Sequence, residues 1–511
     1  MNTELLKKKI LQLAMQGKLV EQDESDGTAD ELISQILEEK KKMMIEGKIK
    51  KEKLSKIYKN PTDNHYYEKF EDGKENPLKN LMLLPNKWQY IKMNDIIFYE
   101  QPSKYIVEST NYNDKYKTPV LTAGKSFILG YTNETKGIFS KVPTIIFDDF
   151  TTESKYVDFD FKVKSSAMKI LNCSHLINIK FIYYLLQVIN VDTSTHKRHW
   201  LSNYEYMIIP IPSKKVQDRI VAKIEELFKK VESINKHYNR INKLKELLKS
   251  KIIDMAIKGE LTKQLPTDEP SSKLIKNILE EKRKLMKEDK IKKENLSVIY
   301  KDSTDNQFYE KFDNGKIMNI TKEIPFNVPT NWSWTRLKNL GELLSGYAYK
   351  RSMYVKKSNN LVIRLGNVKN DKIIYNAHPV YINNTLANET QKYLIEENDI
   401  LITMTGTRHK RDYFYTKLID KKDIINYNLY LNQRVGKFKC NLNMNLDYLI
   451  KIFKSKIISN QVFSKETGTA NQGNIGVDAI LNILVPIPPI NEQNRISKIL
   501  IMTNNTIKTA E

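Results

Sequence analysis

The sequence predicts an α+β protein, with two α+β domains related by pseudo-twofold symmetry and separated by long antiparallel coiled-coil helices. A shift of 242 positions aligns residues 5–74 with residues 247–316 without a gap, and 39 of the 70 positions are identical. An apolar seam of heptad spacing runs through the middle of the chain, and dissimilar β-rich segments lie between the repeated stretches. Solenoid repeats are about 20–50 residues long, so a single duplication explains this period better.

A long central helix is the first predicted element. From Ile220 the apolar residues recur at alternating spacings of four and three, the pattern of a coiled-coil seam. The seam continues through Ile224, Leu227, Val231, Ile234, Tyr238, Ile241, Leu248, Ile252 and Met255, with Lys245 at one position. A helix over 218–257 would be about 60 Å long, and Gly259 is a plausible stop. Residues 488–511 match the beginning of this helix and Leu5–Gly17 match its end, so we expect the termini to meet and rebuild an antiparallel partner.

A second helical stretch follows each helix end, at about 29–47 and 271–289. Polar connectors run from there to Trp88 and Trp332, and we expect them to be the least globular parts of the chain. Between the repeats, β-rich runs such as Thr144–Phe147 and Asp399–Met404 and short helices such as Lys180–Val188 indicate α+β domains. The expected segments are 1–84, 85–212, 213–328, 329–488 and 489–511, the last pairing with the N-terminus.

The charge of the chain favours a polyanionic partner. Lysine and arginine number 84 against 61 acidic residues, a formal net charge of +23, and nucleic acid is the commonest partner of such proteins. Part of the charge could instead reflect the lysine-rich composition of proteins from AT-rich genomes. Only 11 of the 84 basic residues are arginine, so the pair Arg408 and Arg411 stands out.

Two cysteines far apart in sequence form neither a disulfide framework nor a metal cluster, which favours a reducing cytosol. No apolar run resembles a signal peptide or a membrane span of about 18 residues. The expected location is therefore the cytoplasm, with no membrane partner.

Motifs for catalysis are missing from the sequence. The nearest match to the Asn-Pro-Pro-aromatic motif of methyltransferases is Asn60–Asp63, and Pro119 occupies the position where a phosphate-binding loop ending at Gly124-Lys125 needs glycine. Asp149, Glu153 and Lys155 imitate a nuclease set, but their spacing places them on one short loop. His196 and His199 lack a third ligand nearby. We therefore expect neither a catalytic site nor a metal site.

Polar loops are the better candidates for function. One is the run of residues 196–200 and another is 408–411, where cations follow an apolar strand; both suit phosphates or guanine edges. The amides of residues 471–474 suit adenine, although a solvated loop is the alternative for each. The candidate DNA-binding residues are Lys125, Tyr131, His196, Lys197, Arg198, His199, Trp200, Arg408, His409, Lys410, Arg411, Asn471, Gln472 and Asn474.

With these motifs the chain resembles the specificity subunit of type I restriction-modification enzymes over nearly its whole length. The carrying elements are a Pro-x-x-Trp-x-aromatic opening, the strand Asn398–Leu401 leading to Gly406, Leu431-Asn432-Gln433, and a Pro-Ile-Pro-to-Gln-x-Arg-Ile exit into a helix. The opening occurs as Pro85, Trp88, Tyr90 and as Pro329, Trp332, Trp334; the exit occurs at 210–220 and 486–496. The first variable segment lacks the Asn-Asp-Ile-Leu and Leu-Asn-Gln strings.

The resemblance implies a non-catalytic prokaryotic protein. Segments 85–212 and 329–488 would be target-recognition domains, each reading half of a split sequence in double-stranded DNA, while the repeated helices dock two methyltransferase subunits. S-adenosylmethionine, ATP and Mg²⁺ would belong to those methyltransferases and to a restriction and translocase subunit, so this chain itself would bind no cofactor. The alternatives are a stand-alone DNA-binding coiled-coil scaffold and a nuclease fused to its own specificity domains.

Overall fold

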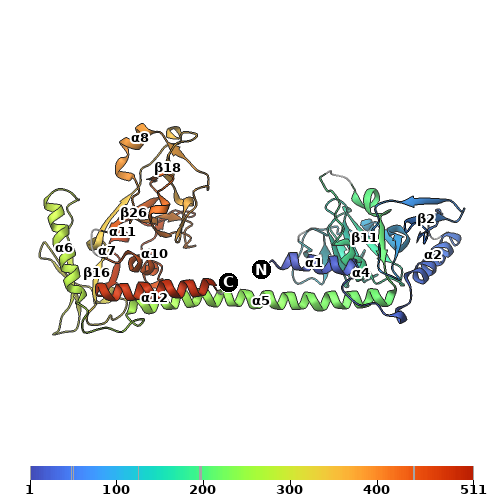
Figure 1. Cartoon of the computed structure of the whole chain (residues 1–511), viewed down its shortest axis with the longest axis horizontal. Coiled ribbons are helices and arrows are strands. Elements are labelled where there is room, and N and C mark those ends of the chain that lie inside the picture. Colours follow the sequence, from blue (N-terminus) through green and yellow to red (C-terminus); the bar gives the residue numbers. More distant parts are fainter. Residues whose placement is uncertain are drawn as a thin grey trace. The chain divides into compact units, whose positions relative to one another are not determined.

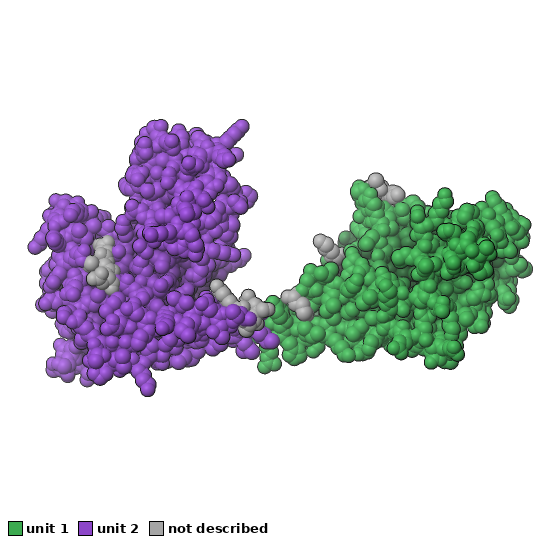
Figure 2. Space-filling view, in the orientation of Figure 1, with its two compact units in different colours: residues 1–240 green, residues 241–511 purple. Residues whose placement is uncertain are grey.

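The computed structural model describes residues 2–47, 49, 51–124, 126–194, 198–440 and 444–509. It divides into two compact units, residues 1–240 and 241–511, which Figure 2 shows in different colours. Each unit combines helices with small sheets, in agreement with the predicted α+β class. No helix within the described ranges is both long enough and apolar enough to cross a membrane.

The first unit contains two helices, a small sheet and then a mixed domain (Figure 1). Its elements are α1 (Thr3–Met15), α2 (Ala29–Ile45), β1 (Ser55–Lys59), β2 (Tyr66–Phe70), β3 (Glu75–Leu78), β4 (Gln89–Lys92), α3 (Met93–Ile96), β5 (Ile97–Glu100), β6 (Thr118–Leu121), β7 (Ile128–Thr132), β8 (Thr144–Asp148), β9 (Ser154–Val157), β10 (Lys162–Val163), β11 (Met168–Cys173), α4 (Ile179–Leu186), β12 (Ile208–Ile211) and the beginning of α5 (Lys214–Lys258).

The second unit repeats this order with a larger mixed domain. After the end of α5 come α6 (Ser271–Lys287), β13 (Ser297–Lys301), β14 (Phe308–Phe312), β15 (Ile317–Asn319), β16 (Ser333–Arg336), α7 (Leu337–Leu340), β17 (Gly341–Ser345), β18 (Asn360–Ile363), β19 (Val368–Lys369), β20 (Lys372–Ile373), β21 (Tyr381–Ile382), α8 (Asn384–Glu389), β22 (Ile400–Thr403), β23 (Thr405–Gly406), β24 (Thr416–Leu418), β25 (Asn428–Leu431), β26 (Val435–Cys440), α9 (Leu446–Ile452), α10 (Lys456–Phe463), β27 (Thr467–Gly468), β28 (Gly473–Asn474), α11 (Val477–Leu481), β29 (Leu484–Ile487) and α12 (Ile490–Thr509).

The predicted central helix is confirmed as α5, a continuous helix of 45 residues that ends before Gly259, whose φ is +73°. A terminal helix packs antiparallel on each half of it. In the first unit Lys7 of α1 lies 3.4 Å from Glu232, and in the second unit Glu492 at the start of α12 accepts a hydrogen bond from Thr262, just beyond α5. The expected pairing of segment 489–511 with the N-terminus connects the two units and stays a prediction.

Glycine fits each helix end against the opening motif of the following domain. A Cβ on Gly17 would lie 2.6 Å from Pro85, and a Cβ on Gly259 would lie 2.4 Å from Pro329. Both glycines have positive φ, which side chains rarely adopt. The repeated Gly, Pro and Trp therefore form one contact that occurs in both units.

The exit motif forms a second repeated contact. The side chain of Gln217 donates to the carbonyl of Pro212 (3.0 Å) and accepts from the backbone of Asn178 (2.9 Å). Gln493 makes the same pair of bonds, to Pro488 (2.9 Å) and from Asn445 (3.0 Å). Two residues later an arginine pairs with a buried aspartate in each unit: Arg219 with Asp26 and Arg495 with Asp268.

The sequence led us to expect that the connectors are the least globular parts of the chain, and this prediction is wrong. Each folds into a three-stranded antiparallel sheet, β1-β2-β3 in the first unit and β13-β14-β15 in the second. Helix α2 or α6 and this sheet together are called the repeat module below. Each sheet turns at a glycine with positive φ, Gly73 or Gly315, preceded by Asp or Asn. That dipeptide is a strong hairpin signal.

Each repeat module is followed by a mixed domain, and these two dissimilar domains are called the variable domains below (85–212 and 329–488). Their opening and closing strands pair with each other, β4 with β12 and β16 with β29. The main sheets have the order β5-β11-β8-β9 in the first domain and β17-β26-β22-β24 in the second. Adjoining sheets, β10-β6-β7 and β21-β18-β25, cover a second core in each.

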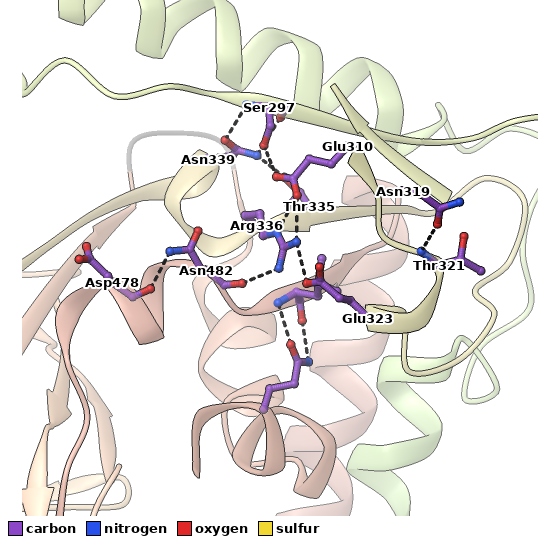
Figure 3. Close-up of polar contacts among 12 residues, drawn as sticks. Ser297, Glu310, Asn319, Thr321, Glu323, Thr335, Arg336, Asn339, Asp478 and Asn482 are labelled. Atoms are coloured by element: carbon purple, nitrogen blue, oxygen red, sulfur yellow. Dashed lines mark hydrogen bonds and ion pairs between the residues drawn. The ribbon is translucent and has the colours of Figure 1, made fainter. Parts of the chain in front are cut away.

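A buried ion pair fastens the second repeat module to its variable domain (Figure 3). The guanidinium of Arg336 donates to Glu310 of β14 at 2.9 and 3.1 Å, to Glu323 at 2.8 Å and to the carbonyl of Asn482 at 2.9 Å. Glu310 is buried and also accepts a bond from Ser297 (2.6 Å). One side chain thus joins the sheet of the module to the opening strand β16 and to the end of α11.

Candidate nucleic-acid interface

The basic loop and the amide loop of the second variable domain lie side by side. Strand β22 leads through Met404 into β23, which pairs with β28 through Thr405↔Asn474 and Gly406↔Gly473. Strand β27 completes a small three-stranded sheet. Two loops that the sequence separates by about sixty residues therefore flank one sheet.

Two glycines permit this close approach. A Cβ on Gly406 would lie 2.5 Å from the ring of Tyr413, and a Cβ on Gly473 would lie 2.6 Å from the hydroxyl of Tyr413 and 2.3 Å from the carboxylate of Glu466. Tyr413 is buried and donates to Glu466 at 2.5 Å. Burial raises the pKa of Tyr413, and the hydrogen bond to the Glu466 carboxylate raises it further. The hydroxyl therefore stays protonated and remains the donor in this bond.

The loop from Thr407 to Asp412 is held in an unusual backbone conformation. The carboxylate of Asp412 accepts bonds from the hydroxyl and the backbone N–H of Thr407, both at 2.7 Å, and these bonds lower the pKa of Asp412. His409 and Arg411 have φ of +65° and +53°, which is uncommon outside glycine. Such conformations persist where surrounding contacts enforce them, and they concentrate at functional sites.

The two arginines of this loop bind neighbouring segments of the chain. Arg408 donates to the carbonyl of Gly468 (3.1 Å). Arg411 donates to Asn460 (2.8 Å), and its guanidinium lies 5.4 Å from the ring centre of Phe463. His409 and Lys410 are exposed. Arg411 is exposed as well, so the exposed basic groups of the loop are His409, Lys410 and Arg411, while Arg408 is half-buried.

A cavity of about 430 Å³ opens beside this sheet. Its walls come from β23 and the loops after β18, β25 and β27: Leu365, Gly366, Lys369, Thr405, Gly406, Thr407, Asp412, Tyr415, Arg434, Asn471 and Gln472. Lys369 lies over the ring of Tyr415, 4.9 Å from its centre. The cavity thus combines two cations, an aromatic face and two amides, the groups that contact phosphates and base edges.

Sequence reasoning missed Lys369, Tyr415 and Arg434. Arg434 carried a signal, because it follows the Leu431-Asn432-Gln433 string directly and arginine is scarce in this chain. Nothing in the sequence marked Lys369 or Tyr415, which are 46 residues apart in the chain and come together only in the fold. Of the residues predicted in the amide loop, Asn471, Gln472 and Asn474 are all exposed.

In the first variable domain the structure describes only some of the predicted DNA-binding residues. Lys125, His196 and Lys197 lie outside the described residues. Arg198 is exposed, and Tyr131 is half-buried in β7.

His199 and Trp200 are buried, which corrects their assignment to a DNA-contacting loop. Trp200 packs edge-on against Phe147 at 5.4 Å, so it serves the core. Trp200 therefore belongs to the hydrophobic core, although it follows a basic string in the sequence.

The residues that imitate a nuclease have structural partners. The carboxylate of Asp149 is buried, accepts a bond from the backbone of Trp200 (2.8 Å) and lies 3.7 Å from Lys169. Lys155 lies 3.8 Å from Glu153. This geometry gives no support to a nuclease.

Comparisons with known proteins agree with the family resemblance. Residues 329–511 match the family described as type I restriction modification DNA specificity domain. The specificity subunit of the Escherichia coli enzyme EcoR124I/EcoR124II is 53% identical over 130 residues, 24% of this chain and 32% of that protein. The Escherichia coli EcoAI specificity subunit is 26% identical over an alignment of 574 residues, 98% of this chain and 90% of the relative.

A solved structure shows the same fold. One chain from a study of complex assembly and conformational transition of the type I R-M system shares 13% identity with this chain at a TM-score of 0.53. The match covers 84% of this chain and 93% of that chain.

Proposed function

We propose that this chain is a type I restriction-modification specificity subunit that reads a bipartite sequence in double-stranded DNA and docks methyltransferase and restriction subunits. The match of residues 329–511 to the family and the similarity to the EcoAI specificity subunit support this proposal. The chain's own role is non-catalytic. Each variable domain would read one half of the target. S-adenosylmethionine, ATP and Mg²⁺ would be bound by the partner subunits, and the complex would act in the cytoplasm.

The observation that carries this proposal is the convergence of two loops on one cavity in the second variable domain. Lys369 and Arg434 supply charge, and Asn471 and Gln472 supply amides beside it. A basic and amide-lined cavity next to an exposed loop cation, Lys410, provides both the phosphate contacts that position DNA and the polar groups that read bases.

A binding experiment on the assembled complex tests the role of this cavity. Selection from a library of random duplexes should return two half-sites separated by a gap. Arg434→Ala and Gln472→Ala should relax preference in one half-site by about 1–3 kcal/mol per affected base pair and leave the other unchanged. Lys422→Ala removes an exposed charge elsewhere on the same domain and should change neither. Relaxation of both half-sites, or of none, would contradict the assignment.

Shortening α5 tests the proposal that the chain recognises two DNA half-sites separated by a gap. This one helix contains residues of both units, and deletion of Val231–His237 keeps the heptad phase while removing about 10 Å at 1.5 Å per residue. Ten ångströms is about three base pairs at 3.4 Å each. The selected gap should change while the half-sites persist, and an unchanged gap would show that α5 does not space them.

Identical residues at matching exposed positions of the two repeats support docking of two copies of one partner. Packing explains why buried positions stay identical, but it does not explain Leu5 and Leu247, 65% and 49% exposed, or Leu6 and Leu248, 40% and 49% exposed. Large exposed apolar side chains at matching places favour two equivalent contacts. Native mass spectrometry should show two methyltransferase subunits per chain, and Leu247→Asp with Leu248→Asp should remove one. A complex that keeps a single copy throughout would contradict this proposal.

A further inference from the structure

A second cavity in the same unit shares no lining residue with the cavity beside β23, although both border the β19–β20 hairpin. Its volume is about 680 Å³, within the range of small-molecule sites. It lies between α5, α9, α12 and the β19–β20 turn, and it is lined by Glu246, Lys249, Ser250, Ile252, Ile253, Asn370, Asp371, Lys372, Lys451, Lys454, Leu500, Thr503, Asn504 and Ile507.

The cavity contains more positive than negative charge. Four of its lining residues are lysines and two are acidic. Lys451 and Lys454, at the end of α9, have side chains only 18% and 15% exposed, and both ammonium groups share the single carboxylate of Asp371. Burial, with repulsion from Lys451 adding to it, lowers the pKa of Lys454. One carboxylate thus faces two partly buried cations.

The turn that carries Asp371 is fixed in place. Asp371 has a φ of +64°, and its backbone N–H donates to the carbonyl of Thr416 (3.1 Å), while the side chain of Asn370 accepts from the N–H of Thr416 (3.1 Å). These bonds hold the backbone of the turn beside the cavity. The Asp371 carboxylate, 55% exposed, is the acidic group paired with both lysines, and a further anion would add to the charge balance.

The first unit provides an internal comparison, because it has a cavity of about 570 Å³ at the equivalent place between α1, α4 and α5. Matching the capping residues Asn178 and Asn445 of α4 and α9 places Tyr184 where the second unit has Lys451, and Gln187 where it has Lys454. Tyr184 lies edge-on to Phe228 (5.8 Å) and Gln187 donates to Ser154 (2.7 Å). The equivalent positions of the first unit thus hold neutral residues, which provide matched substitutions for the lysine pair.

We propose that the cavity between α5, α9 and α12 binds a phosphate group through Lys451 and Lys454. Lysine ammonium groups bind phosphate as point charges, and the partial burial of the pair strengthens that attraction relative to exposed lysines. The phosphate is supplied either as a free anion or by a nucleic-acid backbone. This site is separate from the cavity lined by Arg434 and does not rest on the proposed reading of bases.

Amine footprinting of the full chain tests the site. Acylation of Lys451 and Lys454, followed by peptide mass spectrometry, is measured with inorganic phosphate, with pyrophosphate, with a duplex of arbitrary sequence, and with sodium chloride at equal ionic strength. At a phosphate concentration ten times Kd, acylation should slow about tenfold, while Lys421 and Lys422 on the same domain should not change. Protection by the duplex alone would identify the nucleic-acid backbone as the source.

Residues of the first unit serve as matched substitutions. A chain with Lys451→Tyr and Lys454→Gln should keep its thermal unfolding temperature and lose the rise in that temperature that phosphate gives the native chain. If this chain fails to fold, Lys454→Gln alone and the footprint of the native chain decide. Protection by neither phosphate nor DNA, or an equal phosphate effect on the substituted chain, would overturn the proposal.

Discussion

Replacing Arg336 by methionine should destabilise the junction between the second repeat module and its variable domain. The guanidinium makes bonds of 2.8–3.1 Å to Glu310, Glu323 and the carbonyl of Asn482. Methionine fills similar volume but leaves Glu310, 2% exposed, with Ser297 as its remaining side-chain donor. Breaking a buried pair in this way costs about 3–5 kcal/mol.

Hydrogen exchange is the suitable assay, because a two-unit protein does not unfold in one two-state step. Amides of β14 and β16 should exchange roughly two to four orders of magnitude faster in Arg336→Met, at about 1.4 kcal/mol per factor of ten. Arg336→Lys should cost less, since a lysine, Lys92, pairs with Glu68 at the equivalent place in the first unit. Arg283→Met removes a half-exposed pair with Asp313 and should cost at most about 1 kcal/mol. If Arg336→Met costs no more than Arg283→Met, the junction does not depend on this ion pair.

Three further predictions concern local structure. Gly473→Ala should weaken sequence-specific DNA binding, because its Cβ would meet Glu466 and Tyr413, whereas Gly476→Ala has free space and ordinary φ and should bind normally in the same assay. Arg219 lowers the pKa of Asp26 to about 2. The stabilisation of the first unit by this pair is therefore present above about pH 4 and is lost towards pH 2. In urea unfolding, the native chain should lose stability between these pH values more steeply than Arg219→Met. Burial raises the pKa of Cys173 to about 12, so native alkylation at pH 8 should be roughly a thousandfold slower than for a free thiol, and comparable rates in native and denatured protein would exclude this burial.

The sequence predicts the helices of the scaffold well because their signals are local. The heptad seam gives α5 to within a few residues, and Gly259 ends it. Helices α2 and α6 agree with the predicted 29–47 and 271–289 within two residues at each end. Burial along the seam differs from expectation, however: Ile224 is fully buried, but Ile234 and Ile241 are each 50% exposed. The spacing of apolar residues identifies the seam, but it does not predict which segment packs on each part of it, because that depends on tertiary structure.

The candidate site was only partly predictable, because it is assembled by contacts between distant segments. Residue type singled out the loops around Arg408 and Asn471 separately, and only the pairing of β23 with β28 brings them together. The same pairing brings the guanidinium of Arg408 to the carbonyl of Gly468, a contact that residue type does not predict, and the role of Arg408 in DNA binding stays a prediction. The prediction for His199 and Trp200 was wrong. Their place in a basic and aromatic string suggested a surface loop, but both side chains are buried in the structure.

The repeated contacts explain how one scaffold can hold two unlike domains. In each unit the first and last strands of the variable domain pair with each other, so the chain enters and leaves the domain at one place. The Gly-Pro-Trp contact fixes the entering chain, and the Gln and Arg of the exit motif fix the departing helix. Everything between these contacts is free to change its loops without altering the helices. A domain whose ends meet at one fixed place can be exchanged as a block, which would let the proposed DNA target change while the helices that hold the domain stay the same.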